Sequence, residues 1–212
     1  MEETQDNALP LWLAWGREIQ ALSQTGIHFA ENQFQRERYQ RLMEIAADIV
    51  SSYCNLEFSQ TMDLFTDQIG YATPRVDVRG AVFNHNKLLL VRERQDGGWT
   101  MPGGWADVGD KPSGAVEREV FEEAGFQVKA CRVIGIYDAN RSGPLELFHA
   151  FKIVFLCEIV GGEAQPSQET SEVAFFALDE IPELLSGERT RPRHIHDAFT
   201  SMMQPNSSVV FD

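Results

Sequence analysis

Three glutamates lie close together between residues 115 and 125, at a spacing that suits metal binding. On a helix, which turns about 100° per residue, Glu119, Glu122 and Glu123 fall within one arc of about 100°. Carboxylates crowded in this way repel one another, and a hard divalent cation with oxygen ligands offsets the repulsion. Because no His or Cys lies nearby, the pattern favours Mg²⁺ or Mn²⁺ over Zn²⁺.

The residues around these glutamates predict the helix that positions them, from Ser113 to Ala124. An apolar stripe beside the acidic arc places the carboxylates at the edge of the buried face, and it consists of Val116, Val120 and Ala124. Arg118 stands one turn before Glu122 and is able to pair with it. Gly125 is placed to end the helix.

Together with the glycine-rich loop before it, this helix resembles the box of the Nudix hydrolase family, G-x5-E-x7-R-E-U-x-E-E-x-G-U, in which U is apolar. Eight of the nine fixed positions match: Gly104, Arg118, Glu119, Val120, Glu122, Glu123, Gly125 and Phe126. At the ninth, Asp110 stands where the family usually has Glu. Asp reaches less far, so we expect Asp110 to cap the helix or to act behind the metal ligands.

The resemblance implies an α/β/α sandwich with a mixed sheet and hydrolysis of a phosphoanhydride bond in a nucleoside diphosphate linked to another group. It implies Mg²⁺ or Mn²⁺ as cofactor. By matching position, Glu119 and Glu123 are the leading metal ligands, with Glu122 close behind. A backbone carbonyl of Gly103 or Gly104 is a further candidate ligand.

A general base is expected either among the box glutamates, Glu122 and Glu123, or in the polar loop before Val173. That loop carries Glu169 and Glu172, and in several relatives a glutamate from a comparable loop serves as the base. Both are equally well explained as solvated loop carboxylates.

Arginine and tryptophan side chains are candidate substrate contacts. The arginines that could bind the diphosphate are Arg79, Arg92, Arg94 and Arg141. Trp99 and Trp105 flank the glycine loop, and a tryptophan there could stack on a base. The competing interpretation is ordinary surface charge for the arginines and core packing for the tryptophans. The basic cluster from Arg189 to His196 is interpreted as a solvated helix start.

The elements that carry these residues form two unlike parts, which we divide as residues 1–68 and 69–212. Helical spacing predicts helices from about Pro10, from Glu31 to Val50 and around Met62 to Phe65. In the second of these, six residues are expected to face inward: Phe34, Tyr39, Leu42, Ile45, Ala46 and Ile49.

After residue 68 the period changes to that of strands. A hairpin is predicted around Asn84-His85-Asn86, and a C-terminal helix from Arg191 to Met203. Further strands are predicted at Val128–Tyr137, Leu147–Val160 and Val173–Leu178. This mixed order indicates an α/β or α+β domain.

The first 68 residues resemble, more weakly, the N-terminal unit of a bacterial Nudix subgroup. Activities in that subgroup include the cleavage of ADP-ribose and CDP-choline. Two or three helices cannot enclose the aromatic side chains of this segment by themselves, so the segment must pack on its own Nudix domain, on a second chain or on both. We expect a homodimer in which these helices form much of the interface, and packing within one chain alone is the alternative.

The composition limits the other classes of function. The chain has 212 residues and a net charge of −14, which argues against binding duplex DNA. Three widely spaced cysteines and the lack of a basic, apolar leader predict a cytoplasmic protein, and no run is long enough for a membrane span. The alternatives to an enzyme are a non-catalytic nucleotide-sensing regulator and a scaffold.

Overall fold

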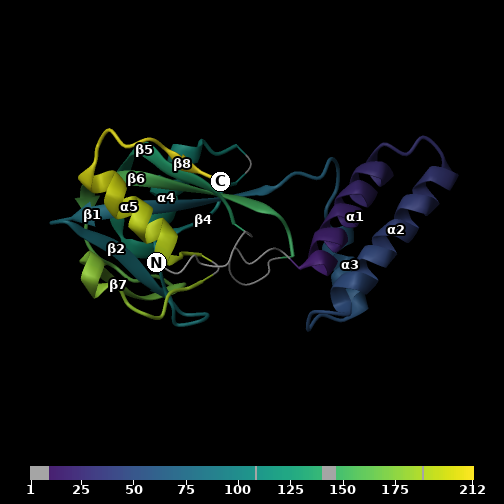
Figure 1. The fold of residues 1–212 in the computed structure, drawn as a ribbon, viewed down its shortest axis with the longest axis horizontal. Helices are drawn as coiled ribbons and strands as arrows, with labels where there is room; N and C mark the ends of the chain where they lie inside the picture. Colours follow the sequence, from purple (N-terminus) through teal and green to yellow (C-terminus); the bar gives the residue numbers. More distant parts are fainter. Residues whose placement is uncertain (1–9, 108, 140–146, 188) are drawn as a thin grey trace. The chain divides into compact units, whose positions relative to one another are not determined.

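The computed structural model describes residues 10–107, 109–139, 147–187 and 189–212, which form two compact units (Figure 1). The helical unit contains residues 10–74 together with 147–149. The sheet unit contains the remaining described residues. No helix among the described residues is long and apolar enough to cross a membrane.

The helical unit is built from α1 (Leu11–His28), α2 (Gln33–Ser51) and α3 (Phe58–Thr66), so the predicted N-terminal helices are confirmed. α1 and α2 approach closely at a glycine: a Cβ added at Gly16 would lie 2.8 Å from the side chain of Val50. Asn32 starts α2 by accepting a hydrogen bond from the Gln35 amide at 3.0 Å.

The core of the helical unit is made mostly of small and medium side chains. Its buried members are Met43, Ala46, Ala47, Val50 and Phe65, and Leu147 and Phe148 pack against them. The expected inward position is therefore wrong for Phe34 and Leu42, which are 74% and 38% exposed. The close approach of α1 and α2 suits the buried alanines of α2, whereas Phe34 and Leu42 remain exposed.

The sheet unit contains a mixed sheet in the order β3-β2-β1-β6-β5-β8, with β4 paired to β1 and β7 paired to β2. The strands are β1 (Arg75–Asn84), β2 (Lys87–Glu93), β3 (Trp99–Thr100), β4 (Gly103–Trp105), β5 (Phe126–Asp138), β6 (Ala150–Gly162), β7 (Thr170–Phe176) and β8 (Val210–Phe211). β1 runs parallel to β6, and β5 parallel to β8, while the other pairs are antiparallel. The predicted hairpin turns at His85 and Asn86, whose φ values of 49° and 61° match the twist of the strands.

Two helices cover the two faces of the sheet, which confirms the α/β/α sandwich. α4 (Pro112–Ala124) packs its apolar stripe on one face, in a core with Val78, Val82 and Phe155. α5 (Pro192–Met203) packs Ile195, Ala198 and Phe199 on the other face. α4 is thereby fixed beside β1, β4 and β7, the strands that carry or border the polar residues described below.

The bounds of the three predicted long strands differ from the structure by one to three residues at each end, and for β6 the packing explains the difference. β6 begins at Ala150 and not at Leu147, because Leu147 and Phe148 pack in the helical unit instead. The Arg17 side chain donates a hydrogen bond to the Leu147 carbonyl at 3.1 Å. Leu147 and Phe148, which were predicted to lie in a strand, therefore belong to the core of the helical unit.

Candidate functional site

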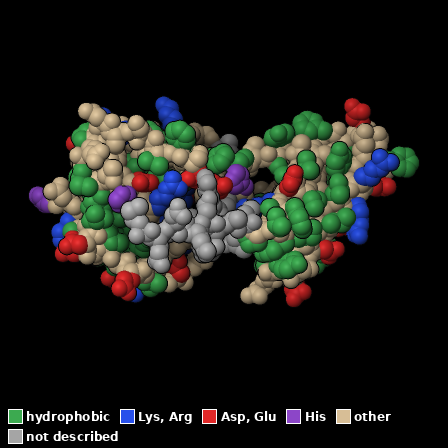
Figure 2. Space-filling view, in the orientation of Figure 1, with side chains coloured by type: hydrophobic (Ala, Val, Ile, Leu, Met, Phe, Trp, Pro, Cys, Tyr) green, Lys and Arg blue, Asp and Glu red, His purple; other side chains and the backbone are tan. Residues whose placement is uncertain are grey.

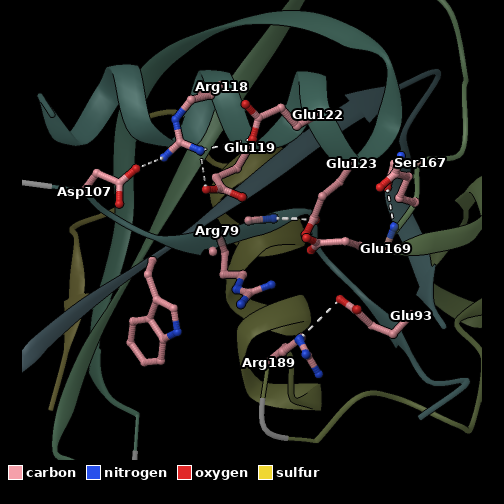
Figure 3. Close-up of a pocket in the computed structure, with 14 residues that line it drawn as sticks. Arg79, Glu93, Asp107, Arg118, Glu119, Glu122, Glu123, Ser167, Glu169 and Arg189 are labelled. Carbon is pink, nitrogen blue, oxygen red and sulfur yellow. Dashed lines mark hydrogen bonds and ion pairs between the residues drawn. The ribbon is translucent and has the colours of Figure 1, made fainter. Parts of the chain in front are cut away.

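A pocket of about 560 Å³ in the sheet unit contains most of the polar residues singled out in the sequence (Figure 3). Its lining residues are Arg79, Glu93, Gly103, Gly104, Trp105, Asp107, Arg118, Glu119, Glu122, Glu123, Ser167, Gln168, Glu169 and Arg189. They come from α4, from three strands, from the segment between β4 and α4 and from the segments before β7 and α5. The structure thus brings together residues that are up to 110 positions apart, from Arg79 to Arg189.

Glu123 is the most deeply placed of the three box glutamates, with 6% of its surface exposed. Its Oε2 accepts a hydrogen bond from the Gly103 amide at 2.9 Å. Gly103 has a φ of +151°, and a Cβ there would lie 2.0 Å from the Val78 carbonyl, so only glycine allows this approach. Burial raises the pKa of Glu123 to about 7, although Arg79 and the Gly103 amide act in the opposite direction.

Arg118 pairs with carboxylates of α4 and of the segment before it. Its Nη1 pairs with Glu119 at 2.7 Å and with Glu122 at 3.1 Å, as the spacing on the helix had predicted for Glu122. Its Nη2 pairs with Asp110 at 3.2 Å. The Glu119 side chain is 14% exposed and that of Glu122 is 56% exposed, so Glu119 lies deeper in the pocket. Burial raises the pKa of Glu119, and Arg118 opposes this shift.

Asp110 does not cap the helix, so that part of the expectation is wrong. α4 begins at Pro112 after Lys111, and no side chain caps its first turn. Proline supplies no amide hydrogen, which removes one of the donors a cap would satisfy. Asp110 instead accepts hydrogen bonds from the side chain of Arg118 and from the backbone amide of Asp107.

Arg79 is a buried cation that faces the carboxylates from β1, with 5% of its surface exposed. Asp77 holds its guanidinium at 2.9 Å, and Lys152 in turn pairs with Asp77 at 2.9 Å. Burial would lower the pKa of Arg79, but the charges of Asp77 and Glu123 raise it on balance. A fixed guanidinium beside a pocket of this kind is able to bind phosphate oxygens.

The two candidate bases of the 169–172 segment lie in different places. Glu169 lines the pocket. It lies in a turn in which Ser167 Oγ accepts a hydrogen bond from the Glu169 amide at 3.1 Å. Glu172 is not among the lining residues and pairs with Arg92 at 2.7 Å. Arg92 is likewise absent from the lining, so the structure separates this arginine from the glutamates of α4.

The remaining candidates divide in the same way. Trp105 lines the pocket, and Arg75 lies 5.9 Å above its ring. Trp99 stacks edge-on against Phe176 in the core. Arg94 donates to the Ser167 carbonyl at 3.4 Å and is not a lining residue. Arg141 falls outside the described residues.

Glu93 and Arg189 are lining residues that the sequence reasoning missed. Glu93 ends β2, where the strand register shifts between Arg92 and Glu93. Such a bulge interrupts the alternation of faces, so the buried position of Glu93 could not be read from the period of the strand. Arg189 had been assigned to a solvated helix start, but its Nε pairs with Glu93 Oε1 at 3.3 Å.

The donor atoms of the pocket fit a hard divalent cation, although they do not form a complete ligand set. Among the described residues, no group of three or more His, Cys, Asp or Glu side chains is arranged to hold a metal ion. Mg²⁺ in proteins is commonly bound by one or two carboxylates, with water and phosphate oxygens completing its shell. Glu119 and Glu123, one turn apart and partly shielded from solvent, offer two such carboxylates.

Comparisons with known protein families agree with this geometry. The NUDIX domain family matches residues 73–199. A second family, described as a UDP-X-like, N-terminal oligomerisation domain, matches residues 10–65. The two matches cover the two parts of the chain that differ in composition and fold.

The chain is also similar to individual proteins over most of its length. It is 35% identical to the putative ADP-ribose pyrophosphatase YjhB of Bacillus subtilis, over 95% of this chain and 97% of the relative. A crystal structure of a UDP-X diphosphatase matches 95% of this chain and 98% of that chain, with a TM-score of 0.61 and 29% identity. An ADP-ribose pyrophosphatase of Streptococcus suis matches 66% of this chain and 100% of that chain, with a TM-score of 0.60 and 37% identity.

Proposed function

Because this chain belongs to the Nudix hydrolase family, we propose that it hydrolyses the phosphoanhydride bond of a nucleoside diphosphate linked to another group, with Mg²⁺ or Mn²⁺ as cofactor. The observation that carries the proposal is the pocket in which Glu119 and Glu123 lie opposite the buried cation Arg79. Phosphoryl transfer needs mainly positioning and charge stabilisation, and this arrangement offers both.

In the proposed mechanism, Glu119 and Glu123 would hold the cation, together with Glu122 and the carbonyl oxygen of Gly103. When bound, a divalent ion neutralises phosphate charge and lowers the pKa of an attacking water. Arg79 binds diphosphate oxygens, and Asp77 and Lys152 keep its guanidinium in place.

The proton of the attacking water needs an acceptor. Glu169 is the proposed base, because it lines the pocket without being part of α4. Glu122 and Glu123 are the other candidates. At the exposed rim, Trp105 offers a ring face on which a nucleobase could stack.

ADP-ribose is the first substrate we propose. The names of the B. subtilis and S. suis relatives refer to ADP-ribose, and that of the other structure refers to UDP-X. CDP-choline, which the subgroup resemblance suggests, remains a candidate.

The test is a hydrolysis assay on ADP-ribose, a UDP-sugar and CDP-choline, each with Mg²⁺, with Mn²⁺ and with excess EDTA. We expect a nucleoside monophosphate as one product, formed only when a metal is present. A chain that binds these compounds but cleaves none of them would instead support the alternative, a nucleotide-sensing regulator. The presence of all three α4 glutamates, Glu119, Glu122 and Glu123, in the pocket favours the enzyme.

We also propose a homodimer formed through the helical unit. Leu11, Trp15 and Leu22 lie on one side of α1 and are 65%, 54% and 59% exposed. Figure 2 shows hydrophobic side chains gathered on the visible face of this unit. Exposed apolar surface of this kind typically marks an interface, and the matching family is described as an oligomerisation domain.

The compartment we propose is the cytoplasm. All three cysteines are described residues, and all are free thiols. Unpaired cysteines, one of them exposed, are typical of a reducing compartment.

A further inference from the structure

Glu93 is a buried carboxylate that faces the pocket from the end of β2 (Figure 3). Its side chain is 5% exposed. None of the described residues donates a hydrogen bond to its Oε1, which forms an ion pair with Arg189 Nε at 3.3 Å. A buried carboxylate oxygen without a donor is costly, so this atom is suited to accept a hydrogen bond from an occupant of the pocket.

Arg189 is held in place beside Glu93 by several contacts. Its Nη1 donates to Ser186 Oγ at 3.2 Å, and its Nη2 donates to Gln95 Oε1 at 3.0 Å. Lys152 donates to the backbone carbonyl of Arg189. Because both the side chain and the main chain are anchored, the carboxylate–guanidinium pair needs little rearrangement to receive a ligand.

The charge around Glu93 favours a neutral donor over a second cation. Arg189 already pairs with the carboxylate, and the charge of Arg79 also favours its ionised form, against the charges of Asp96 and Glu169. A hydroxyl group adds no charge, donates to a carboxylate and accepts from a guanidinium. Neighbouring hydroxyls on a sugar ring offer such groups side by side.

We propose that Glu93, positioned by Arg189, accepts a hydrogen bond from a sugar hydroxyl of the substrate and thereby selects substrates that carry it. This inference rests on the proposed function, since it concerns the substrate of the same pocket. In ADP-ribose, both the adenosine ribose and the terminal ribose carry suitable hydroxyls, and the experiment below separates the two.

The experiment compares ADP-ribose with two analogues, one without the 2′- and 3′-hydroxyls of adenosine and one without the corresponding hydroxyls of the terminal ribose. Glu93→Gln keeps the size of the side chain and removes its charge. We expect this variant to lower kcat/KM for ADP-ribose by about 10- to 100-fold, the scale of a hydrogen bond to a charged group. For the analogue that lacks the bound hydroxyl, variant and wild type should differ by less than about threefold, so that analogue identifies the ribose.

Two further variants make the test specific. Glu158→Gln removes one exposed carboxylate on β6, outside the pocket, and should leave all three substrates unaffected. Arg189→Gln should lower kcat/KM for ADP-ribose but not for the analogue that lacks the bound hydroxyl, as Glu93→Gln does. Arg189→Lys, which keeps the charge, should recover part of that loss in kcat/KM. Such a recovery would distinguish the positioning of Glu93 by Arg189 from a general structural effect. Thermal melting of each variant checks that it is folded.

The outcomes separate this inference from the proposed function. An equal loss on all three compounds in Glu93→Gln, or no loss on any, overturns the hydroxyl contact while hydrolysis by the wild type still stands. If the wild type hydrolyses none of the compounds, the proposed function fails. Calorimetric binding of the same three compounds in metal-free buffer then tests the contact alone, with the same pattern of losses expected in affinity.

Discussion

Burial of Glu123 favours its protonated form, whereas metal binding requires its ionised form. Glu123 is a carboxylate with 6% of its surface exposed, held by the Gly103 amide and facing Arg79. The energetic cost of ionising this group is therefore part of the cost of binding the cofactor.

Metal binding should accordingly depend on pH around neutrality. The raised pKa of Glu123, about 7, means that its contribution to the stability of the metal-free protein is present below its unfolded pKa and is lost as the pH rises through about 7. Affinity for Mg²⁺ should rise over the same range, because the cation binds the ionised form.

Calorimetry in two buffers with different ionisation enthalpies measures this linkage. Proton release is expected at about pH 6 and should largely disappear by about pH 8. The Glu123→Gln variant, which has no proton to lose at this position, provides the control. Binding whose affinity and proton release do not vary with pH would show that Glu123 is not a ligand.

At the scale of elements, the short strand β4 and helix α4 together position the glutamates. Gly104 lies so close to α4 that a Cβ there would be 2.8 Å from Glu119 Oε2. The carboxylate is thus held between a strand without side-chain bulk and the guanidinium of Arg118. Gly103 and Gly104 therefore allow the local backbone conformation and also leave space for the glutamate side chains.

Gly104→Ala should therefore impair activity more than folding. The added methyl displaces the Glu119 carboxylate, which should lower turnover by about 10- to 100-fold, the scale for misplacing a catalytic group by about 1 Å. Gly114→Ala is the matched control, since no heavy atom lies within 4 Å of its added Cβ and it stands on α4 itself. That control should keep full turnover and gain up to about 1 kcal/mol in stability. Equal activities in the two variants would contradict this account of the loop.

The elements also show what could be predicted from the sequence. The helix of the box and the long strands carry clear periods, and the structure confirms them within a few residues. Strands of two or three residues, such as β3 and β8, carry no period. The bulge at Glu93 and the packing of Leu147 depend on neighbours distant in the chain, so local pattern could not reveal them. The sequence likewise offered both Arg79 and Arg92 as diphosphate contacts, and the structure places Arg79 in the pocket while Arg92 pairs with Glu172.

At the scale of the whole molecule, the proposed dimer follows from the outer side of α1. Leu22→Glu places a charge within the exposed apolar stripe and should weaken dimerisation, because a charge buried at an interface without a partner is costly. Leu184→Glu, at an equally exposed leucine of the sheet unit, is the control. Light scattering at micromolar concentration measures both, and a wild-type chain that is monomeric there would contradict the proposal.

The central claim, that the glutamates of α4 support metal-dependent hydrolysis, is tested most directly by the turnover of Glu123→Gln. With ADP-ribose and saturating Mg²⁺, kcat should fall by about 100-fold or more, the scale for losing a positioned electrostatic group. Glu158→Gln, measured beside it, should equal the wild type. Near-normal turnover in Glu123→Gln, or wild-type turnover that persists in excess EDTA, would contradict the account.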